Sequence, residues 1–374
     1  MARYLYLHVP FCIRKCIYCD FYSVPDSLER IDDYVAALCK EIESRKASVG
    51  LLEAVYIGGG TPSILEEKHF SQIMNAIRNN CSFRGDAEIS VESNPGTLTG
   101  PKIGAMLASG INRISIGIQS FNDEELVLLG RMHSSEEATS AVIAAREGGF
   151  RNLSIDLIYG LPGQTAENWQ DTLGKAIDLR PEHISAYELT PEKETPLFHM
   201  LEKSELVMPD DDVIADMYYQ TIDTLARAGY EHYEISNFAM PGFRCRHNIN
   251  YWDRGEYLGI GAGAHSFVEA TRSSSVADVN KYIVAIRNSE PPVTEDSVET
   301  DLDALKETIF LGLRKTEGFD IRLVPDRQMD RMKQALRDLS QQGLIEISGN
   351  MLSLTRKGLM LCNEVIVRLM LRID

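Results

Sequence analysis

The first half of the chain alternates short apolar runs with longer amphipathic segments. The apolar runs are rich in β-branched and aromatic residues and predict strands at residues 4–9, 54–57, 88–91, 113–118, 153–158 and 183–187. The segments between them repeat apolar positions every three or four residues and predict helices at residues 31–45, 66–79, 101–108, 123–129, 135–147 and 166–178. Strands separated by helices imply a parallel sheet with right-handed crossovers. Six such units are too few to close an eight-stranded barrel.

The pattern changes after the sixth predicted strand. A helix is predicted at residues 210–228, and the stretch 230–252, which is dense in aromatic residues and histidine, is predicted to be a loop. Residues 300–374 predict a helix, a hairpin with a Gly349-Asn350 turn, and a last helix, an order typical of a winged-helix-like α+β module. The expected regions are therefore residues 1–200, 201–292 and 293–374.

Three cysteines follow the first strand at the spacing C-x3-C-x2-C, namely Cys12, Cys16 and Cys19. Three thiolates this close can hold one iron–sulfur cluster. A [4Fe–4S] cluster has four irons, so three cysteines leave one iron open to another ligand. The cysteines alone also fit a zinc site in which His8 is the fourth ligand.

Polar residues follow the other predicted strands where each strand ends. The stretch Gly58-Gly59-Gly60-Thr61 follows the second strand, Glu92 ends the third, Gln119 ends the fourth, and Asp156 lies late in the fifth. The carboxyl ends of parallel strands meet at one edge of a sheet, which is where ligands bind in such folds. The glycines would let a backbone approach a ligand closely. The sequence therefore predicts one site that includes the cysteines.

The string His8-Val-Pro-Phe-Cys12…Cys16-x-Tyr-Cys19-Asp-Phe21 resembles the radical S-adenosylmethionine (SAM) superfamily. Within it, the string is similar to the branch that holds oxygen-independent coproporphyrinogen III oxidase and the HemW-type heme chaperone. The resemblance implies an α/β fold, a partial (β/α)6 barrel with a winged-helix-like carboxyl-terminal module. It also implies a [4Fe–4S] cluster on Cys12, Cys16 and Cys19, whose open iron binds the amino and carboxylate groups of SAM. The implied residues around the cofactor are Tyr6, Phe21, Gly59, Gly60, Thr61, Glu92, Gln119, Arg131 and Asp156.

Some of these assignments have structural alternatives. Arg131 is otherwise a solvated charge at a helix end, Glu92 a surface strand end, and Tyr6 a half-buried strand aromatic. The string His247-Asn-x-x-Tyr251-Trp252 is found in the heme-chaperone-like members, so the resemblance implies heme as a further ligand. An imidazole beside aromatic walls can ligate heme iron, which makes His247 the candidate ligand, ahead of Cys245 and His265. The alternative is a histidine hydrogen-bonded within a packed aromatic loop.

Composition narrows the functional classes. The chain has 374 residues, 44% of them hydrophobic, which suits two or three domains. The formal net charge of −17 disfavours nucleic acid as a partner, which weakens a winged-helix regulator as a third function. No apolar run of about 18 residues and no signal-peptide pattern is present, so no membrane span is expected. Seven cysteines, an odd number, favour a reducing, cytoplasmic compartment.

Two functions share every motif of the predicted barrel. The oxidase decarboxylates porphyrinogen propionates through a 5′-deoxyadenosyl radical, whereas the chaperone binds heme and transfers it to hemoproteins. The oxidase pattern carries one more cysteine where this chain has Phe21, and it has a segment ahead of the first strand where only about three residues precede it here. We therefore expect a heme chaperone with SAM, heme and acceptor hemoproteins as partners, and we keep the oxidase as the alternative.

Overall fold

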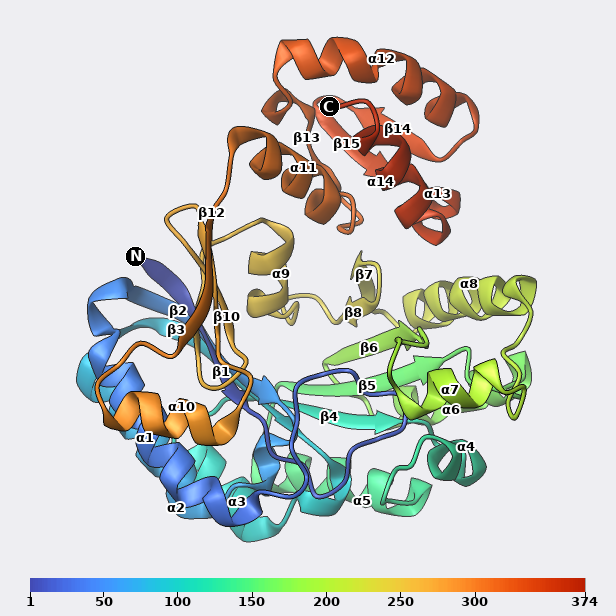
Figure 1. Cartoon of the computed structure of the whole chain (residues 1–374). Coiled ribbons are helices and arrows are strands. Elements are labelled where there is room, and N and C mark those ends of the chain that lie inside the picture. The colour runs from blue at the N-terminus through green and yellow to red at the C-terminus, as the bar shows by residue number, and fades with distance from the viewer. Residues whose placement is uncertain (374) are drawn as a thin grey trace.

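The computed structural model describes residues 1–373, and its centre is a curved sheet (Figure 1). Its first six strands are β1 (Ala2–Val9), β2 (Val49–Gly59), β3 (Ser82–Ser93), β4 (Arg113–Gln119), β5 (Leu153–Tyr159) and β6 (His183–Glu188). They pair in parallel and in chain order. Every predicted strand is present, and the α/β fold with a partial (β/α)6 barrel is confirmed.

A helix connects each strand to the next, as predicted. The helices of this half are α1 (Ile31–Ser44), α2 (Glu67–Asn80), α3 (Gly100–Ala108), α4 (Asp123–Leu128), α5 (Ser135–Gly148) and α6 (Ala166–Asp178). Strand β4 shows why the two faces of the sheet differ. Ile114, Ile116 and Ile118 are fully buried in the apolar core, whereas Arg113 and the polar positions that alternate with them line a cavity inside the barrel. The inner face is therefore polar, unlike the apolar interior of most closed barrels.

Residues 231–260 return to both edges of this sheet. After α7 (Pro196–Glu202) and α8 (Asp211–Arg227), β8 (Asn237–Ala239) pairs antiparallel with β6, and β7 (Glu231–Glu234) pairs with β8. At the opposite edge β9 (Leu258–Ile260) runs parallel to β1, which completes a nine-stranded sheet. These strands have three or four residues each, too few to show a period in the sequence.

The aromatic stretch 230–252 is not a loop, contrary to the prediction. It contains β7, β8 and a short helix, α9 (Arg246–Trp252). The oxygen Oε1 of Glu88 accepts a hydrogen bond from the backbone N–H of Arg246 at 3.1 Å, which caps the start of α9. At the other end the Asn250 side chain donates to the backbone oxygens of Gly255 and Glu256. The first cap comes from a residue 158 positions earlier, so no local signal marks the helix.

The rest of the chain forms two antiparallel sheets. β10 (His265–Val268), β11 (Thr271–Ser275) and β12 (Val293–Val298) form one, with α10 (Val279–Arg287) inserted. The predicted helix–hairpin–helix module follows and lies beyond β12 in Figure 1. It consists of α11 (Asp301–Gly312), β13 (Phe319–Asp320), α12 (Asp326–Gln341), β14 (Ile345–Ser348), β15 (Met351–Leu354), α13 (Arg356–Met360) and α14 (Cys362–Met370). No helix within residues 1–373 has the length and apolarity needed to cross a membrane.

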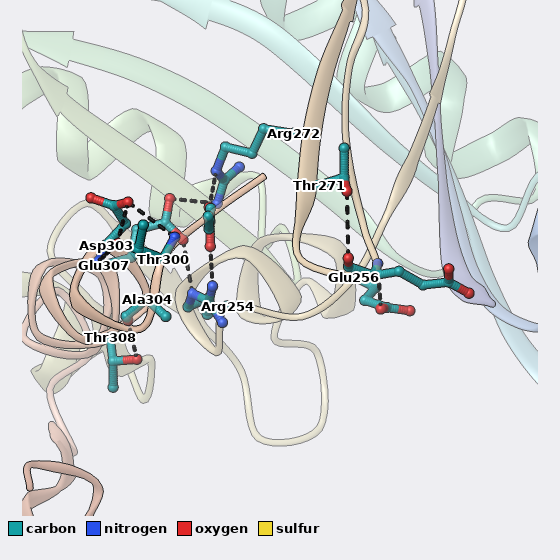
Figure 2. Close-up of polar contacts among 11 residues, drawn as sticks. Arg254, Glu256, Thr271, Arg272, Thr300, Asp303, Ala304, Glu307 and Thr308 are labelled. Atoms are coloured by element: carbon teal, nitrogen blue, oxygen red, sulfur yellow. Dashed lines mark hydrogen bonds and ion pairs between the residues drawn. The ribbon is translucent and has the colours of Figure 1, made fainter. Parts of the chain in front are cut away.

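A cluster of four charged residues joins the end of α9 to the carboxyl-terminal module (Figure 2). Arg254, which follows α9, donates to Glu307 of α11 at 2.9 Å and pairs with Glu299. Arg272 of β11 reaches Glu299 at 2.6 Å and Glu307 at 2.5 Å. Both guanidinium groups lie over the ring of Phe267, at 4.8 and 4.4 Å from its centroid. We call these four charged residues the charge cluster.

Glu299→Ala removes the carboxylate that both arginines of the charge cluster share. Glu299 is only 8% exposed, so its loss leaves two guanidinium groups short of an acceptor. We expect the free energy of unfolding, measured by urea titration, to fall by about 2 kcal/mol. Asp330→Ala, which breaks an exposed ion pair with Lys333, is the control and should leave it unchanged. Equal effects of the two substitutions would contradict this account.

Candidate functional site

A cavity of about 400 Å³ lies between the loop after β1 and the inner face of the sheet. Cys12, Cys16 and Cys19 all line it. Eight of the nine residues expected around the cofactor line it as well, namely Phe21, Gly59, Gly60, Thr61, Glu92, Gln119, Arg131 and Asp156. We call this space the rim cavity. The structure thus brings together residues that the sequence placed after five different strands.

The cysteine loop, residues 10–24, is tied down at both ends. The backbone N–H of Val24 donates to the oxygen of Pro10 at 2.7 Å, and the N–H of Cys12 donates to the oxygen of Val24 at 3.3 Å. Burial raises the pKa of the Cys12 and Cys19 thiols above the usual value. Buried thiols of this kind become thiolates when a metal coordinates them, because the ion supplies the compensating charge.

His8 is not free to complete a zinc site with these cysteines. Its Nδ1 pairs with the Tyr6 hydroxyl at 2.9 Å, and its Nε2 pairs with the backbone oxygen of Tyr22 at 2.9 Å. Within residues 1–373 no group of three or more His, Cys, Asp or Glu side chains converges on a single-ion site. The zinc alternative therefore lacks its fourth ligand, while three cysteines along one cavity wall fit a cluster whose irons take one ligand each.

The glycines after β2 let the cysteine loop lie directly against the strand end. A Cβ at Gly60 would lie 2.6 Å from the Phe11 oxygen and 3.0 Å from the Cys12 sulfur. Gly59 has φ +118°, and a Cβ there would lie 2.8 Å from the His8 ring. The backbone N–H of Thr61 donates to Phe11 at 2.8 Å, and its hydroxyl contacts the Cys12 sulfur at 3.4 Å. A side chain at Gly60 would push the cysteine loop away, and one at Gly59 would clash with the His8 ring.

Two half-buried carboxylates, Glu92 and Asp156, face the rim cavity from β3 and β5. Glu92 accepts a hydrogen bond from the Tyr56 hydroxyl at 2.8 Å and from the Gly59 N–H at 3.1 Å. Burial raises the pKa of Glu92 to about 7, although the Tyr56 hydrogen bond opposes it. Burial also raises the pKa of Asp156, whose oxygens accept from the Ser115 hydroxyl at 3.0 Å. A cationic ligand in the cavity would favour the ionised form of both.

Arg131 and Gln119 complete the wall of the rim cavity. Arg131 donates to the Cys16 sulfur at 3.4 Å and to Asn94 Oδ1 at 2.6 Å, so it is not a solvated surface charge. Its Nε is buried without a partner. Gln119 has φ +74°, a left-handed conformation that is rare for a residue with a Cβ and is concentrated at functional sites. Glu92 is likewise half-buried in the cavity wall, where Tyr56 and Gly59 donate to it, and is not a surface strand end.

Tyr6 and His247 lie beside the rim cavity and do not line it. The Tyr6 ring stacks on His247 at 6.0 Å, and Tyr56 stacks on His247 at 5.0 Å with an interplanar angle of 20°. His247 is 1% exposed, and its Nε2 pairs with the Tyr251 hydroxyl at 2.9 Å. Its Nδ1 is buried with no partner. Burial lowers the pKa of His247 to about 3, so the imidazole is neutral and keeps a lone pair for a metal.

The other two candidate heme ligands are placed less favourably. Burial raises the pKa of Cys245 to about 12, and its thiol points to Glu88 at 3.7 Å, so the thiolate is disfavoured. His265 is exposed at the start of β10, on the separate three-stranded sheet.

Arg113 and Asn94 are among the residues of the cavity that sequence reasoning missed. Arg113 is the first residue of β4 and lies on the same face as Ser115 and Gln119. The alternation of polar and apolar residues along this strand therefore indicates that Arg113 faces the cavity. Asn94 follows the Glu92 strand end by two positions and bonds both Arg131 and Thr61.

Comparison with known proteins identifies the class. Residues 6–176 match the family model described as Radical SAM superfamily, and residues 300–361 match the HemN C-terminal domain. The chain is 36% identical over 367 residues to heme chaperone HemW of Bacillus subtilis (strain 168), covering 96% of this chain and 97% of that one. It is 41% identical to heme chaperone HemW of Escherichia coli (strain K12), covering 71% and 70%. Among solved structures it is similar to coproporphyrinogen III oxidase (HemN) from Escherichia coli, with a TM-score of 0.83, 25% identity, and 98% and 89% coverage.

The chain therefore belongs to the radical SAM superfamily. Within it, the chain is a member of the HemW family, because its likeness to those proteins extends over nearly the whole length of both. The superfamily implies a [4Fe–4S] cluster and SAM. The donor set fits both: three thiols on one wall, a glycine cradle that a Cβ would fill, two half-buried carboxylates, and an unpaired Arg131 Nε.

Gly60→Ala tests the contact between the glycine turn and the cysteine loop. The added Cβ would displace the Cys12 sulfur, so anaerobically reconstituted protein should lose most of its iron and sulfide. Gly96→Ala is the matched control, because a Cβ there meets nothing within 4 Å. Circular dichroism should show both variants folded. A folded Gly60→Ala protein with full iron content would show that the close approach is not needed.

Proposed function

We propose that this protein is a heme chaperone that uses a radical SAM body to hold a [4Fe–4S] cluster and SAM, and that it delivers heme to acceptor hemoproteins. The observation that carries the proposal is His247, a neutral imidazole with an unpaired Nδ1, whose ring stacks on those of Tyr56 and Tyr6. The likeness to proteins named heme chaperone HemW supports it. Phe21, 66% exposed at the cavity where the oxidase pattern has a cysteine, disfavours the oxidase alternative.

In this proposal Cys12, Cys16 and Cys19 each bind one iron of the cluster. Arg131 donates to the Cys16 sulfur and offsets the negative charge of the thiolates. The backbone of Gly59, Gly60 and Thr61 leaves room beside the cysteine loop for the methionine part of SAM. When bound to the open iron, SAM supplies one-electron radical chemistry.

The remaining polar groups of the rim cavity orient the cofactor. Glu92 and Asp156 face the positive charges of SAM or its ribose hydroxyls, and Gln119 offers an amide at the strained strand end. Tyr6 supports this wall from behind through His8 and Tyr56. In the proposal a single imidazole, that of His247, binds the heme, because the heme must dissociate again to reach an acceptor hemoprotein.

Heme reaches His247 only if α9 moves. The imidazole is 1% exposed, and its Nε2 is held by Tyr251 one turn later on the same helix. Helix α9 has seven residues and gains most of its stability from tertiary contacts.

All seven cysteines are unpaired, which fits the proposed cytoplasmic location.

The SAM assignment predicts a pH dependence. Below about pH 7 Glu92 takes up a proton and loses the charge that attracts SAM, so the affinity of the cluster-loaded parent for SAM should fall. Glu92→Gln should weaken binding by about 1–3 kcal/mol at pH 8 and remove most of this dependence. Isothermal titration between pH 6 and 8 measures it, with the exposed Glu124→Gln as control. Unchanged binding by Glu92→Gln would show that Glu92 does not contact SAM.

The heme assignment separates chaperone from oxidase. Titration of the parent with heme should give a Soret shift that His247→Ala abolishes, whereas His265→Ala should leave it intact. Tyr251→Phe frees Nε2 and should bind heme faster and at least as tightly. In parallel, the parent with reductant, SAM and coproporphyrinogen III should form no protoporphyrinogen IX. Turnover without heme binding would overturn the chaperone in favour of the oxidase.

A further inference from the structure

Arg113 is a buried guanidinium at the deep end of the rim cavity. It is the first residue of β4, is 2% exposed, and shares the inner face of that strand with Ser115 and Gln119. Glu92, Gln119 and Asp156 lie nearer the carboxyl ends of their strands. Arg113 and Asn248 of α9 therefore form the floor of the cavity, on the side of His247.

The charge of Arg113 meets no direct partner. Its guanidinium makes no hydrogen bond or ion pair with any part of the chain that the structure describes, and its Nε is fully buried. Glu88 lies nearby and its charge favours the cation, but its Oε1 accepts from the backbone of Arg246 and from the Cys245 thiol. Glu92 and Asp156 line the same cavity, and the Arg113 charge lowers the pKa of both against the larger effect of burial, but neither forms a hydrogen bond or ion pair with it. Cys245 is neutral, because burial raises its pKa to about 12. An unpaired buried charge is costly, so a built-in cation of this kind marks a place for an anion.

We propose that Arg113 anchors a carboxylate of the bound ligand at the floor of the rim cavity. The planar guanidinium can donate two parallel hydrogen bonds to a carboxylate, and Asn248 and Ser185 are further polar groups in the lining of the same cavity. The inference rests on the proposed heme-carrying function, under which the carboxylate is a heme propionate.

The geometry connects this anchor to the proposed iron ligand. Tyr56 lines the rim cavity and stacks on His247, and the Arg113 charge is close enough to contribute to the lowered pKa of that imidazole. One heme could thus engage both residues once α9 has moved. A cavity of about 400 Å³ suits a small ligand, so a propionate arm enters it while the macrocycle stays outside.

Whether the protein recognises the heme propionates can be tested without any substitution. Heme and heme dimethyl ester differ only in the propionate charges, so the cluster-loaded parent should bind heme about 10- to 100-fold more tightly than the ester. Arg113→Lys should lose most of this discrimination while its Soret spectrum still shows imidazole ligation. Arg337→Lys, on the exposed face of α12, is the control and should behave as the parent.

Each other result either contradicts the proposal or assigns the carboxylate to a different residue or ligand. Equal affinity of the parent for heme and ester overturns it, whether or not Arg113→Lys folds. If the parent discriminates and folded Arg113→Lys does so equally, the propionate is bound elsewhere and the assignment to Arg113 is wrong. SAM also carries a carboxylate, so the same proteins are titrated with SAM. If Arg113→Lys weakens the binding of SAM and leaves the binding of heme unchanged, Arg113 binds the carboxylate of SAM. Parent protein that binds no heme overturns the proposed function instead, and the SAM titration then decides Arg113 alone.

Discussion

The partial barrel places three charged side chains on its inner face, and the rest of the structure depends on this constraint. Glu92, Asp156 and Arg113 all lie on the inner face of the sheet, where a closed barrel would place branched apolar side chains. Burial raises the pKa of both carboxylates, and the guanidinium has no direct partner. Such a site costs stability when it is empty and recovers it when ligands of opposite charge bind. The apolar layer between the sheet and the helices supplies the stability that offsets this cost.

The same constraint explains why the glycine turn and the cysteine loop are in contact. A cluster held by three thiols must sit at the mouth of the polar interior, and only glycine at position 60 lets Cys12 come that close to β2. Arg131 then connects the Cys16 sulfur to Asn94 at the end of β3. The cysteine loop and the strand ends that line the rim cavity are therefore positioned by one continuous set of contacts.

The sequence predicted the parts of the fold that local interactions determine. Helix α5 begins with a capping box between Ser134 and Glu137, and each strand from β1 to β6 contains an apolar run of its own. Most of their bounds therefore agreed with the structure to within two residues, although β2 and β3 begin five and six residues earlier than predicted. Helix α9 was missed because Glu88, 158 residues away in sequence, caps it. The contact of His247 with Tyr6 and the isolation of Arg113 also could not be predicted, because both depend on which distant residues fill the space around them. The residues that line the rim cavity were predictable because parallel strands end at the same edge of the sheet. The surroundings of His247 were not, because they depend on how residues 231–260 pack against the edges of that sheet.

Tyr56 links the two halves of the site. Its hydroxyl donates to Glu92 at 2.8 Å in the wall of the rim cavity, and its ring stacks on His247 at 5.0 Å beneath it. Any movement of α9 that frees His247 also uncovers one face of Tyr56 and so alters the group that holds Glu92. The charge cluster fixes the end of the same helix to the carboxyl-terminal module through Arg254. Helix α9 therefore lies between the cofactor site and the module. A displacement of the module would therefore strain the Arg254 contacts at the end of the helix that covers the imidazole.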